Sequence, residues 1–458
     1  MSLPKYPHYK PSGVQWLGDV PAHWGVDRIK ASIASARNGI WGDEPLGAES
    51  DIACVRVADF DRGRLQVKQK IPTVRSVTEK ERAGRILQQG NLLLEKSGGG
   101  EIQPVGQVVL YQLDEPAVCS NFVARIVLKQ GMYPGFWNYV HSAAYSVGVN
   151  IGSINQTSGI QNLDQDRYFN ERAPFPPLDE QTAIAHFLDH ETSKIDALIA
   201  EQEKLIHLLA EKRQATISHA VTRGLDPAAP MKDSGIEWLG EVPAHWEILT
   251  FQRCVYVQEG QVDPENEPFR SMILIAPNHV ESGTGRILGT ETAQEQAAES
   301  GKYLCKSGDV IYSKIRPALR KVCIAPEDCL CSADMYPLRG IAGLSNSFLM
   351  WFMLSEPFSA LAVLESERVA MPKINRESLK AVWVPVPSLQ EQVKISTFLA
   401  QETTRLDTLR AEAERAIALL KERRAALIAA AVTGQIDVRQ NSEILNGGEA
   451  RDAVAALS

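Results

Sequence analysis

The sequence lacks the features of membrane and secreted proteins. It has no run of about 18 apolar residues, so we expect no membrane-spanning helix. Its first ten residues lack the apolar stretch of about 7–15 residues that a signal peptide needs. The seven cysteines are odd in number and irregularly spaced, which argues against a disulfide framework. These absences favour a reducing cytoplasm as the location of the protein.

The sequence also lacks the motifs of several enzyme classes. It contains no phosphate-binding loop of the P-loop ATPases, no HExxH zinc motif and no serine nucleophile elbow. The Asn/Asp-Pro-Pro-aromatic motif of DNA methyltransferases is missing, and Gly283, Gly285 and Gly289 have the wrong spacing for a dinucleotide-binding loop. We therefore predict a non-catalytic chain that binds no cofactor of its own.

Four cysteines fall within one short stretch: Cys305, Cys323, Cys329 and Cys331. Four thiolates can hold a structural zinc ion, but such sites usually contain closely spaced cysteine pairs that are absent here. Cys329 and Cys331 instead fit alternate positions of a strand. We expect buried, reduced thiols and no metal site, and we leave the role of the group open.

Length and charge leave the choice of ligand open. A chain of 458 residues that is 44% hydrophobic has room for about three domains of roughly 150 residues each. The net charge of −8 discourages binding to nucleic acid at first sight. However, a local basic surface binds phosphate whatever the charge of the whole chain, so this value excludes nothing.

What the sequence does contain is an internal repeat. The segment SGVQWLGDVPAHW at 12–24 returns as SGIEWLGEVPAHW at 234–246. A second pair starts with PFPPLDEQTAIAHFLD at 174–189 and PVPSLQEQVKISTFLA at 385–400, and it continues to 226 and 437. Each half therefore reads as a Trp-rich segment, a variable body and a long charged segment. This order indicates a tandem duplication whose middles have diverged.

The long charged segments predict two helices, over 178–222 and 389–433. Neither segment contains Gly or Pro, whereas Gly224 and Gly434 follow as stop signals. Apolar residues recur at a spacing near 3.5: Ile195, Leu198, Leu205 and Leu209 in the first, and Leu406, Leu409, Ala416 and Leu420 in the second. Each helix would extend roughly 65 Å, at about 1.5 Å per residue. We expect the two to pack antiparallel, with a plain spacer as the simplest role.

The bodies between these segments read as mixed α/β, because β-rich runs alternate with turn signals and short apolar helices. We therefore predict an α+β fold, with two globular mixed α/β domains in a pseudo-two-fold arrangement, separated by two long antiparallel coiled-coil helices. The predicted boundaries are 1–177 for the first domain with its Trp-rich segment, 178–222 for the first spacer helix, 223–388 for the second domain, 389–434 for the second helix and 435–458 for a mobile C-terminal tail.

Polar and basic loops are the candidate ligand-binding features of the bodies. The EKSGGG loop offers side chains and backbone N–H groups to phosphate, and INQTSGIQN offers side chains that can read base edges. The candidates in the first body are Lys96, Ser97, Gly98, Gly99, Asn155, Gln156, Thr157 and Gln161. Those in the second body are Ser313, Lys314, Arg316, Arg320, Arg368, Lys373, Asn375 and Arg376. Solvated loop tips remain the alternative, although recurrence at matching places in both halves favours a function.

With these motifs identified, the sequence resembles the specificity subunits of type I restriction-modification systems. The resemblance rests on the two Trp-rich segments, the two Leu-x-Glu-Gln helix starts and the EKRQATISHAVTRGL ending, and it covers nearly the whole chain. It implies that each body is a target recognition domain that reads one half of a split sequence in double-stranded DNA. The long helices would then set the distance between the half-sites.

The same resemblance implies partners. Two methyltransferase subunits would methylate adenine with S-adenosylmethionine, and motor-nuclease subunits would use ATP and Mg²⁺ to cut unmethylated DNA in phage defence. Residues expected in docking are Trp16, Trp24, Glu180, Gln181, Phe187, Arg213, Trp238, Trp246, Glu391, Gln392, Phe398 and Arg424; the four tryptophans would also anchor each body to a helix end. Two alternatives stay open: a repeat scaffold that binds only proteins, and a specificity-like subunit of another DNA-based defence system. The recognised bases stay unknown.

Overall fold

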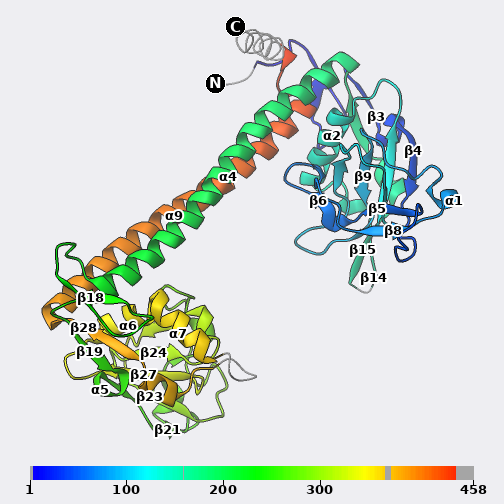
Figure 1. Cartoon of the computed structure of the whole chain (residues 1–458). Coiled ribbons are helices and arrows are strands. Elements are labelled where there is room, and N and C mark those ends of the chain that lie inside the picture. The colour runs from blue at the N-terminus through cyan, green and yellow to red at the C-terminus, as the bar shows by residue number, and fades with distance from the viewer. Residues whose placement is uncertain (1–3, 158, 367–372, 440–458) are drawn as a thin grey trace. The chain divides into compact units, whose positions relative to one another are not determined.

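The computed structural model describes residues 4–157, 159–366 and 373–439 (Figure 1). The chain forms two compact units, the first from residues 1–202 with 415–458 and the second from residues 203–414. Each unit contains one body together with parts of both long helices. The bodies are mixed α/β, as the sequence predicts.

The two long helices are α4 (Leu178–Arg223) and α9 (Leu389–Val432). They confirm the predicted helices to within one residue at each end. Gly224 and Gly434 follow the helices with φ values of +77° and +74°, a left-handed conformation that suits glycine at a helix C-terminus. In each unit the start of one helix and the end of the other lie in a common core, so the helices are antiparallel there.

Three sheets of three or more strands make up most of the described body of the first unit. The largest has the order β4-β13-β9-β11-β7-β6, formed by Ile33–Asn38, Val123–Leu128, Leu92–Glu95, Val108–Leu110, Gln66–Val67 and Phe60–Asp61. A second sheet has the order β12-β5-β8, formed by Ala117–Cys119, Asp51–Val55 and Val74–Ser76. The third has the order β10-β15-β14, formed by Ser97–Gly98, Ile160–Leu163 and Ile154–Thr157.

Alternation along β9 divides the first body into two cores. Leu92 and Leu94 face α2 (Pro134–Ser146) and the helix ends, whereas Leu93 faces the core of the second sheet. Successive side chains of a strand point to opposite faces, which explains why all three leucines of this strand, Leu92 to Leu94, are buried. The core shared by β9 and α2 also takes in Ile184 of α4 and Val432 of α9, which fixes the body on the helices.

The body of the second unit has two four-stranded sheets. One has the order β20-β27-β24-β25, formed by Val255–Val257, Met335–Gly340, Val310–Ser313 and Val322–Ile324. The other has the order β21-β23-β26-β22, formed by Gln261–Val262, Lys302–Cys305, Cys329–Cys331 and Leu274–Ile275. Helices α6 (Asn346–Leu354) and α7 (Glu356–Ser366) pack with Ile217 of α4 and Ile395 of α9 in its main core.

The repeated sequences form the same elements in both units. The Trp-rich segments form the loop and the second strand of the hairpins β1–β2 (Tyr9–Pro11, Asp19–Pro21) and β17–β18 (Met231–Asp233, Glu241–Pro243). The strands before the long helices, β16 (Arg172–Phe175) and β28 (Trp383–Val386), pair with β3 (Gly25–Arg28) and β19 (Glu247–Thr250). The duplication seen in the sequence is therefore also a duplication of local structure.

The four clustered cysteines lie in a core of the second body and are free thiols. Burial raises the pKa of Cys323 to about 12, so this thiol stays neutral and unreactive. Within the described ranges, no group of three or more His, Cys, Asp or Glu side chains could hold a metal ion.

No single helix in the described part of the chain is long and apolar enough to cross a bilayer. Helices α6 and α7, bent by 67°, pass that test only as a pair, and only by length and composition. Their side chains Phe348, Phe352 and Phe358 are buried in the core of the second unit.

The chain between 435 and 439, assigned from the sequence to a mobile tail, packs on the first unit. Val438 is buried in its core, and the Asp437 backbone N–H donates to the Pro4 carbonyl at 2.8 Å. Asp437 also pairs with Arg439 at 2.7 Å. These contacts hold the five residues in place; residues 440–458 lie outside the described part of the chain.

Candidate functional site

A buried carboxylate joins the two repeated motifs in the first unit. Glu180, in the first turn of α4, accepts hydrogen bonds from Trp24 Nε1 and the Tyr6 hydroxyl, each at 3.0 Å. His23 Nε2 lies 2.6 Å from the second oxygen of the same carboxylate. Burial and the neighbouring Glu180 carboxylate raise the pKa of Tyr6, which therefore stays protonated and acts as a donor. The Trp-rich segment is thus fastened to the start of the helix.

The second unit repeats this arrangement. Glu391 accepts from Trp246 Nε1 at 3.0 Å and lies 3.0 Å from His245 Nε2. No aromatic hydroxyl of the described residues joins it, and its side chain is more exposed than that of Glu180, at 26% against 6%. Sequence reasoning named the tryptophans and glutamates but missed both histidines. Their identity in both copies of the Trp-rich segment is the signal that marks them.

The glutamine after each glutamate fastens the body to the same helix turn. Gln181 Oε1 accepts from the Tyr133 backbone N–H at 3.0 Å, and its amide nitrogen donates to the Pro176 carbonyl at 2.9 Å. Gln392 makes the same two contacts, with Ser345 at 2.8 Å and Pro387 at 2.8 Å. Both glutamines are buried. The Leu-x-Glu-Gln motif therefore connects the Trp-rich segment, the body and the helix.

The other predicted docking aromatics differ between the units. Trp16 Nε1 donates to the Arg172 carbonyl at 3.1 Å, and Trp238 packs against the main core of the second unit. Phe187 is buried, whereas its equivalent Phe398 is 39% exposed. Because Trp24, Trp246 and Phe187 are covered by their own unit, they serve as internal anchors, and of these aromatics Phe398 presents its ring to solvent.

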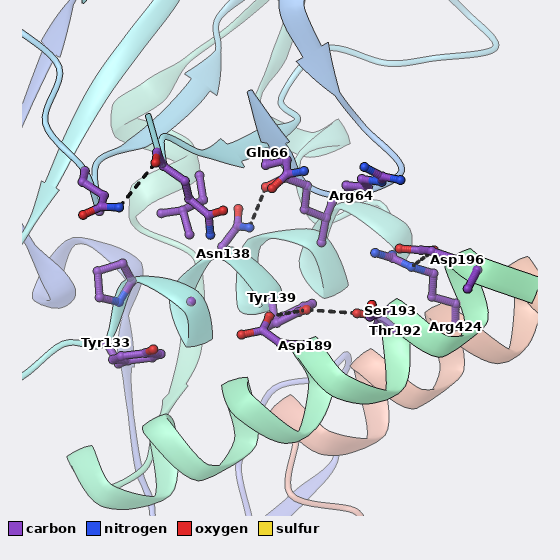
Figure 2. A pocket seen from close by; sticks show the side chains of 18 of the residues that line it. Arg64, Gln66, Tyr133, Asn138, Tyr139, Asp189, Thr192, Ser193, Asp196 and Arg424 are labelled. Carbon is purple, nitrogen blue, oxygen red and sulfur yellow. Dashed lines mark hydrogen bonds and ion pairs between the residues drawn. The ribbon is translucent and has the colours of Figure 1, made fainter. Parts of the chain in front are cut away.

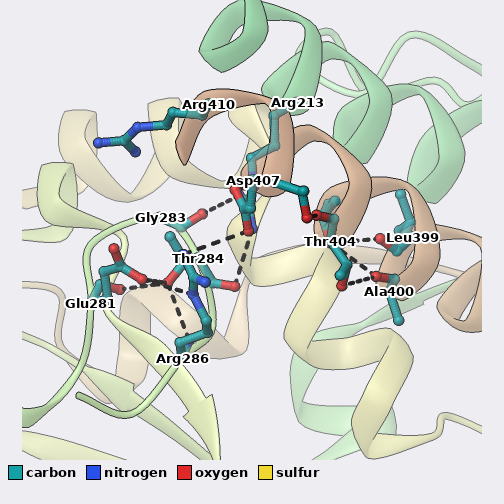
Figure 3. Close-up of polar contacts among 12 residues, drawn as sticks. Arg213, Glu281, Gly283, Thr284, Arg286, Leu399, Ala400, Thr404, Asp407 and Arg410 are labelled. Carbon is teal, nitrogen blue, oxygen red and sulfur yellow. Dashed lines mark hydrogen bonds and ion pairs between the residues drawn. The ribbon is translucent and has the colours of Figure 1, made fainter. Parts of the chain in front are cut away.

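An ion pair between the long helices occurs in each unit. Arg424 of α9 donates from Nε to Asp196 of α4 at 3.0 Å, and Arg213 of α4 lies 3.4 Å from Asp407 of α9 (Figures 2 and 3). The four residues occupy equivalent repeat positions, so one pair is the counterpart of the other. Burial lowers the pKa of Arg213, with the Asp407 charge opposing that shift. The two aspartates are a matched pair of the sequence repeat, although they were not among the predicted site residues.

The two candidate loops of the first body come together in the sheet β10-β15-β14. Ser97 and Gly98 pair with Asn162 and Gln161, and the Ser97 hydroxyl donates to Asn162 Oδ1 at 2.7 Å. Lys96 Nζ donates to Asn38 Oδ1 at 2.8 Å. Loops some 60 residues apart in sequence thus share one surface.

Within this sheet the predicted base-reading residues have different exposures. Asn155 and Gln156 are exposed on β14. Gln161 is buried, and its Oε1 accepts from the Val105 backbone N–H at 3.0 Å, so it supports the loop instead of facing a ligand. Thr157 ends β14, and its side chain lies outside the described part of the chain. A Cβ at Gly99 would come within 2.6 Å of the Val105 nitrogen, which explains the glycine there.

Several candidates in the second body are engaged by their own unit. Ser313 is buried and donates to the Ile315 carbonyl at 3.1 Å. Lys314 Nζ donates to the Ala333 carbonyl at 2.6 Å and lies 5.3 Å from the centre of the Tyr336 ring. Arg320 pairs with Glu356 and donates to the Ser359 hydroxyl at 2.9 Å. These three side chains stabilise their own body. The sequence predicted instead that they would be available to bind a ligand.

The remaining candidates of that body are divided. Arg376 donates to Glu259 Oε1 at 2.7 Å, and Asn375 caps α8 (Arg376–Lys380) by accepting from the Ser378 N–H at 2.8 Å. Both side chains therefore have structural partners. Arg316 and Lys373 are exposed, and Ile315 forms a bridge with Lys373. Arg368 lies outside the described residues.

Backbone contacts show that the candidate surfaces of the two bodies correspond. The Lys96 N–H donates to the Phe122 carbonyl at 2.8 Å, and the Lys314 N–H donates to the Asp334 carbonyl at 3.0 Å. The Lys96 carbonyl accepts from Leu163 at 2.8 Å, as the Lys314 carbonyl accepts from Ile374 at 2.9 Å. The weak sequence similarity around the two lysines therefore reflects a common backbone arrangement.

Comparisons with known proteins point to one family. A family model for the type I restriction modification DNA specificity domain matches residues 272–416. The EcoDI specificity subunit of a type I restriction enzyme from Escherichia coli is 31% identical over 300 residues, which are 62% of this chain and 66% of that subunit. The chain thus spans just under two thirds of that relative. The putative MjaX specificity subunit of Methanocaldococcus jannaschii is 22% identical over 438 residues, which are 92% of this chain and 96% of that subunit.

Solved structures share the fold. The HsdS subunit from Thermoanaerobacter tengcongensis aligns with a TM-score of 0.52 at 15% identity, over 91% of this chain and 98% of that one. A chain from a type I R-M system aligns with a TM-score of 0.62 at 17% identity, over 90% and 98%. At this identity the likeness concerns the fold alone.

Proposed function

Since the chain belongs to the family of type I restriction-modification specificity subunits, we propose that it reads a split DNA target, one half with each body, and catalyses no reaction itself. The observation that carries this proposal is the correspondence of the two bodies. Their Trp–Glu anchors and backbone contacts correspond, whereas the exposed side chains on the corresponding surfaces differ. Two bodies with one frame and different surfaces suit two different half-sites.

The proposed contact surface in the first body is the sheet β10-β15-β14. Its glycines allow backbone N–H groups to approach phosphate, and Asn155 and Gln156 are exposed and carry both donors and acceptors. Amide side chains of this kind pair with adenine in the major groove. In the second body, the exposed Arg316 and Lys373 flank the corresponding position.

The proposed partners are two methyltransferase subunits bound to the long helices. Three equivalent leucine pairs are exposed there, at 48% and 57% for Leu178 and Leu389, 52% and 39% for Leu198 and Leu409, and 49% and 59% for Leu208 and Leu419. Each unit contains one member of every pair. Repeated exposed apolar positions suit two copies of one partner.

In the proposed complex, the methyltransferase subunits methylate adenine with S-adenosylmethionine. Motor-nuclease subunits, which would require ATP and Mg²⁺, add restriction of unmethylated DNA. The contribution of this chain is to position the partners on the target. All three cofactors would belong to the partner subunits.

The test is to express the chain with its methyltransferase in a host and to sequence the host genome with methylation detection. We expect one bipartite adenine-methylated motif. Replacing 247–385 with the body of another family member should change one half of that motif and leave the other half intact. A motif that changes in both halves would contradict the division of labour, and a complex without methylation or specific DNA binding would favour a protein-binding scaffold.

A further inference from the structure

Beside strand β10 the first body has an open cavity of about 980 Å³. Its walls include three large apolar side chains that face solvent: Trp41, Ile102 and Phe122, of which Phe122 is 53% exposed. Clustered exposed apolar side chains on a folded protein usually mark a binding surface. Ser97, Gly98 and Gly99 line the same cavity, which makes it continuous with the proposed DNA-contact sheet.

Cationic groups accompany these apolar walls. Arg56 lines the cavity with a side chain that is 40% exposed, and its Nε lies 3.6 Å from the Asp59 carboxylate. Arg62 also lines the cavity and is held by two hydrogen bonds of 3.0 Å to the buried Glu95. An apolar pocket bordered by guanidinium groups suits a base edge that lies next to phosphates.

At Phe122 the backbone and the side chain have different roles. Its carbonyl accepts from Lys96 N–H at 2.8 Å, and the Asp334 carbonyl does the same for Lys314 at 3.0 Å. The backbone contact therefore persists in both bodies while the side chain changes from an aromatic ring to a carboxylate. Asp334 is exposed, as Phe122 is. Neither side chain is needed to fill a core, so both can vary with the ligand.

We propose that this shared position determines one base of each half-site. Phe122 contacts the 5-methyl group of a thymine, and Asp334 accepts a hydrogen bond from the amino group of a cytosine. Apolar side chains recognise the thymine methyl in the major groove, and acidic side chains recognise the cytosine N4 amine. The inference rests on the proposed function, because it needs the two bodies to face duplex DNA.

The test for Phe122 uses the chain in complex with its methyltransferase and duplexes that carry the methylated motif. Each thymine of one half-site, and then of the other, is replaced in turn by deoxyuridine, which lacks only the methyl group. At one position we expect wild-type binding to weaken about fourfold, since a buried carbon group is worth about 0.8 kcal/mol. Phe122→Ala should bind the thymine duplex more weakly and bind the thymine and deoxyuridine duplexes equally.

Two variants control this experiment. Asn121→Ala changes the exposed neighbour of Phe122 and should keep the full difference between thymine and deoxyuridine. Phe122→Leu keeps an apolar contact and should keep part of it. Unfolding midpoints should be the same for all three variants, because the altered side chains lie outside the core.

The proposal for Asp334 is tested by expressing Asp334→Ala with the methyltransferase and sequencing the motif that the complex methylates. We expect relaxed discrimination at one cytosine position of one half-site and an unchanged second half. If the wild-type complex binds no specific sequence, the proposed function itself fails. If the complex is specific but Phe122→Ala keeps the full thymine preference, or Asp334→Ala leaves the motif unchanged, the inference is overturned while the proposed function stands.

Discussion

The seam between body and helices is bridged by more arginine hydrogen bonds in the second unit than in the first, and its cavity is smaller there. In the second unit Arg213 donates to the Gly283 and Thr284 carbonyls at 2.6 and 3.2 Å, in addition to its pairing with Asp407 (Figure 3). In the first unit the equivalent Arg424 contacts Asp196, and its terminal nitrogens make no hydrogen bond within the described ranges (Figure 2). The seam cavities measure about 840 Å³ in the first unit and about 520 Å³ in the second.

The side chains that line the seam also differ between the two units. In the first unit the Tyr139 hydroxyl donates to Asp189 at 2.8 Å and lies 3.2 Å from the Thr192 hydroxyl (Figure 2). In the second unit the corresponding positions hold Trp351 and Ala400. The duplicated helix residues therefore provide the same frame, and the diverged bodies decide how each seam is filled. The body is therefore attached to the helices at equivalent positions in both units, whereas the contacts that hold it there differ.

The largest expected effect concerns the anchoring carboxylates. Glu180→Ala leaves two buried donors, Tyr6 and Trp24, without this acceptor, whereas Glu391→Ala leaves one, Trp246; the histidine beside each carboxylate is exposed. An unsatisfied buried polar group costs about 1–3 kcal/mol, so we expect a loss of about 3 kcal/mol for Glu180→Ala and about half of that for Glu391→Ala. Urea unfolding followed by tryptophan fluorescence measures both. Glu180→Gln keeps an acceptor and should lose less; equal losses for the two alanine variants would show that the units are anchored alike.

A smaller difference is expected for the two arginines. Arg213→Ala removes an ion pair and two hydrogen bonds to carbonyl groups, so we expect it to destabilise the protein by about 2 kcal/mol. Arg424→Ala removes one partner and should cost about 1 kcal/mol. Hydrogen exchange of the 281–286 turn should rise in Arg213→Ala alone. A greater loss for Arg424→Ala would reverse the order that we infer from the contacts.

The smallest expected effect is a pH dependence confined to the first seam. Burial raises the pKa of Asp189, against the opposing effects of the Tyr139 hydrogen bond and His186. An acid whose pKa is higher in the folded state favours folding at low pH, and this contribution is lost as the pH rises above the ordinary Asp value of about 4. Asp189→Asn should therefore gain stability relative to the wild type across that rise. The same unfolding assay measures the difference in unfolding free energy between Asp189→Asn and the wild type. If that difference is equal at pH 3 and pH 7, the prediction is wrong.

Local sequence determined the repeated frame of this protein. Apolar spacing and the absence of Gly and Pro defined α4 and α9, because helix formation depends on neighbours three and four positions away. The glycines that follow the two helices could be predicted equally well, since a left-handed backbone conformation after a helix favours glycine over other residues. The common core of Cys329 and Cys331 followed from their alternate positions in a strand, which place both side chains on one face.

Only the tertiary structure decided which polar side chains are free to bind. Gln161, Arg320 and Arg376 have the composition of ligand-binding residues, but their partners Val105, Glu356 and Glu259 are between 36 and 117 positions away. The meeting of Trp24 with Glu180, 156 positions apart, is likewise invisible to local patterns. Propensity and periodicity act over one or two turns of chain, whereas a hydrogen-bond partner is set by which surfaces the fold brings within about 3 Å.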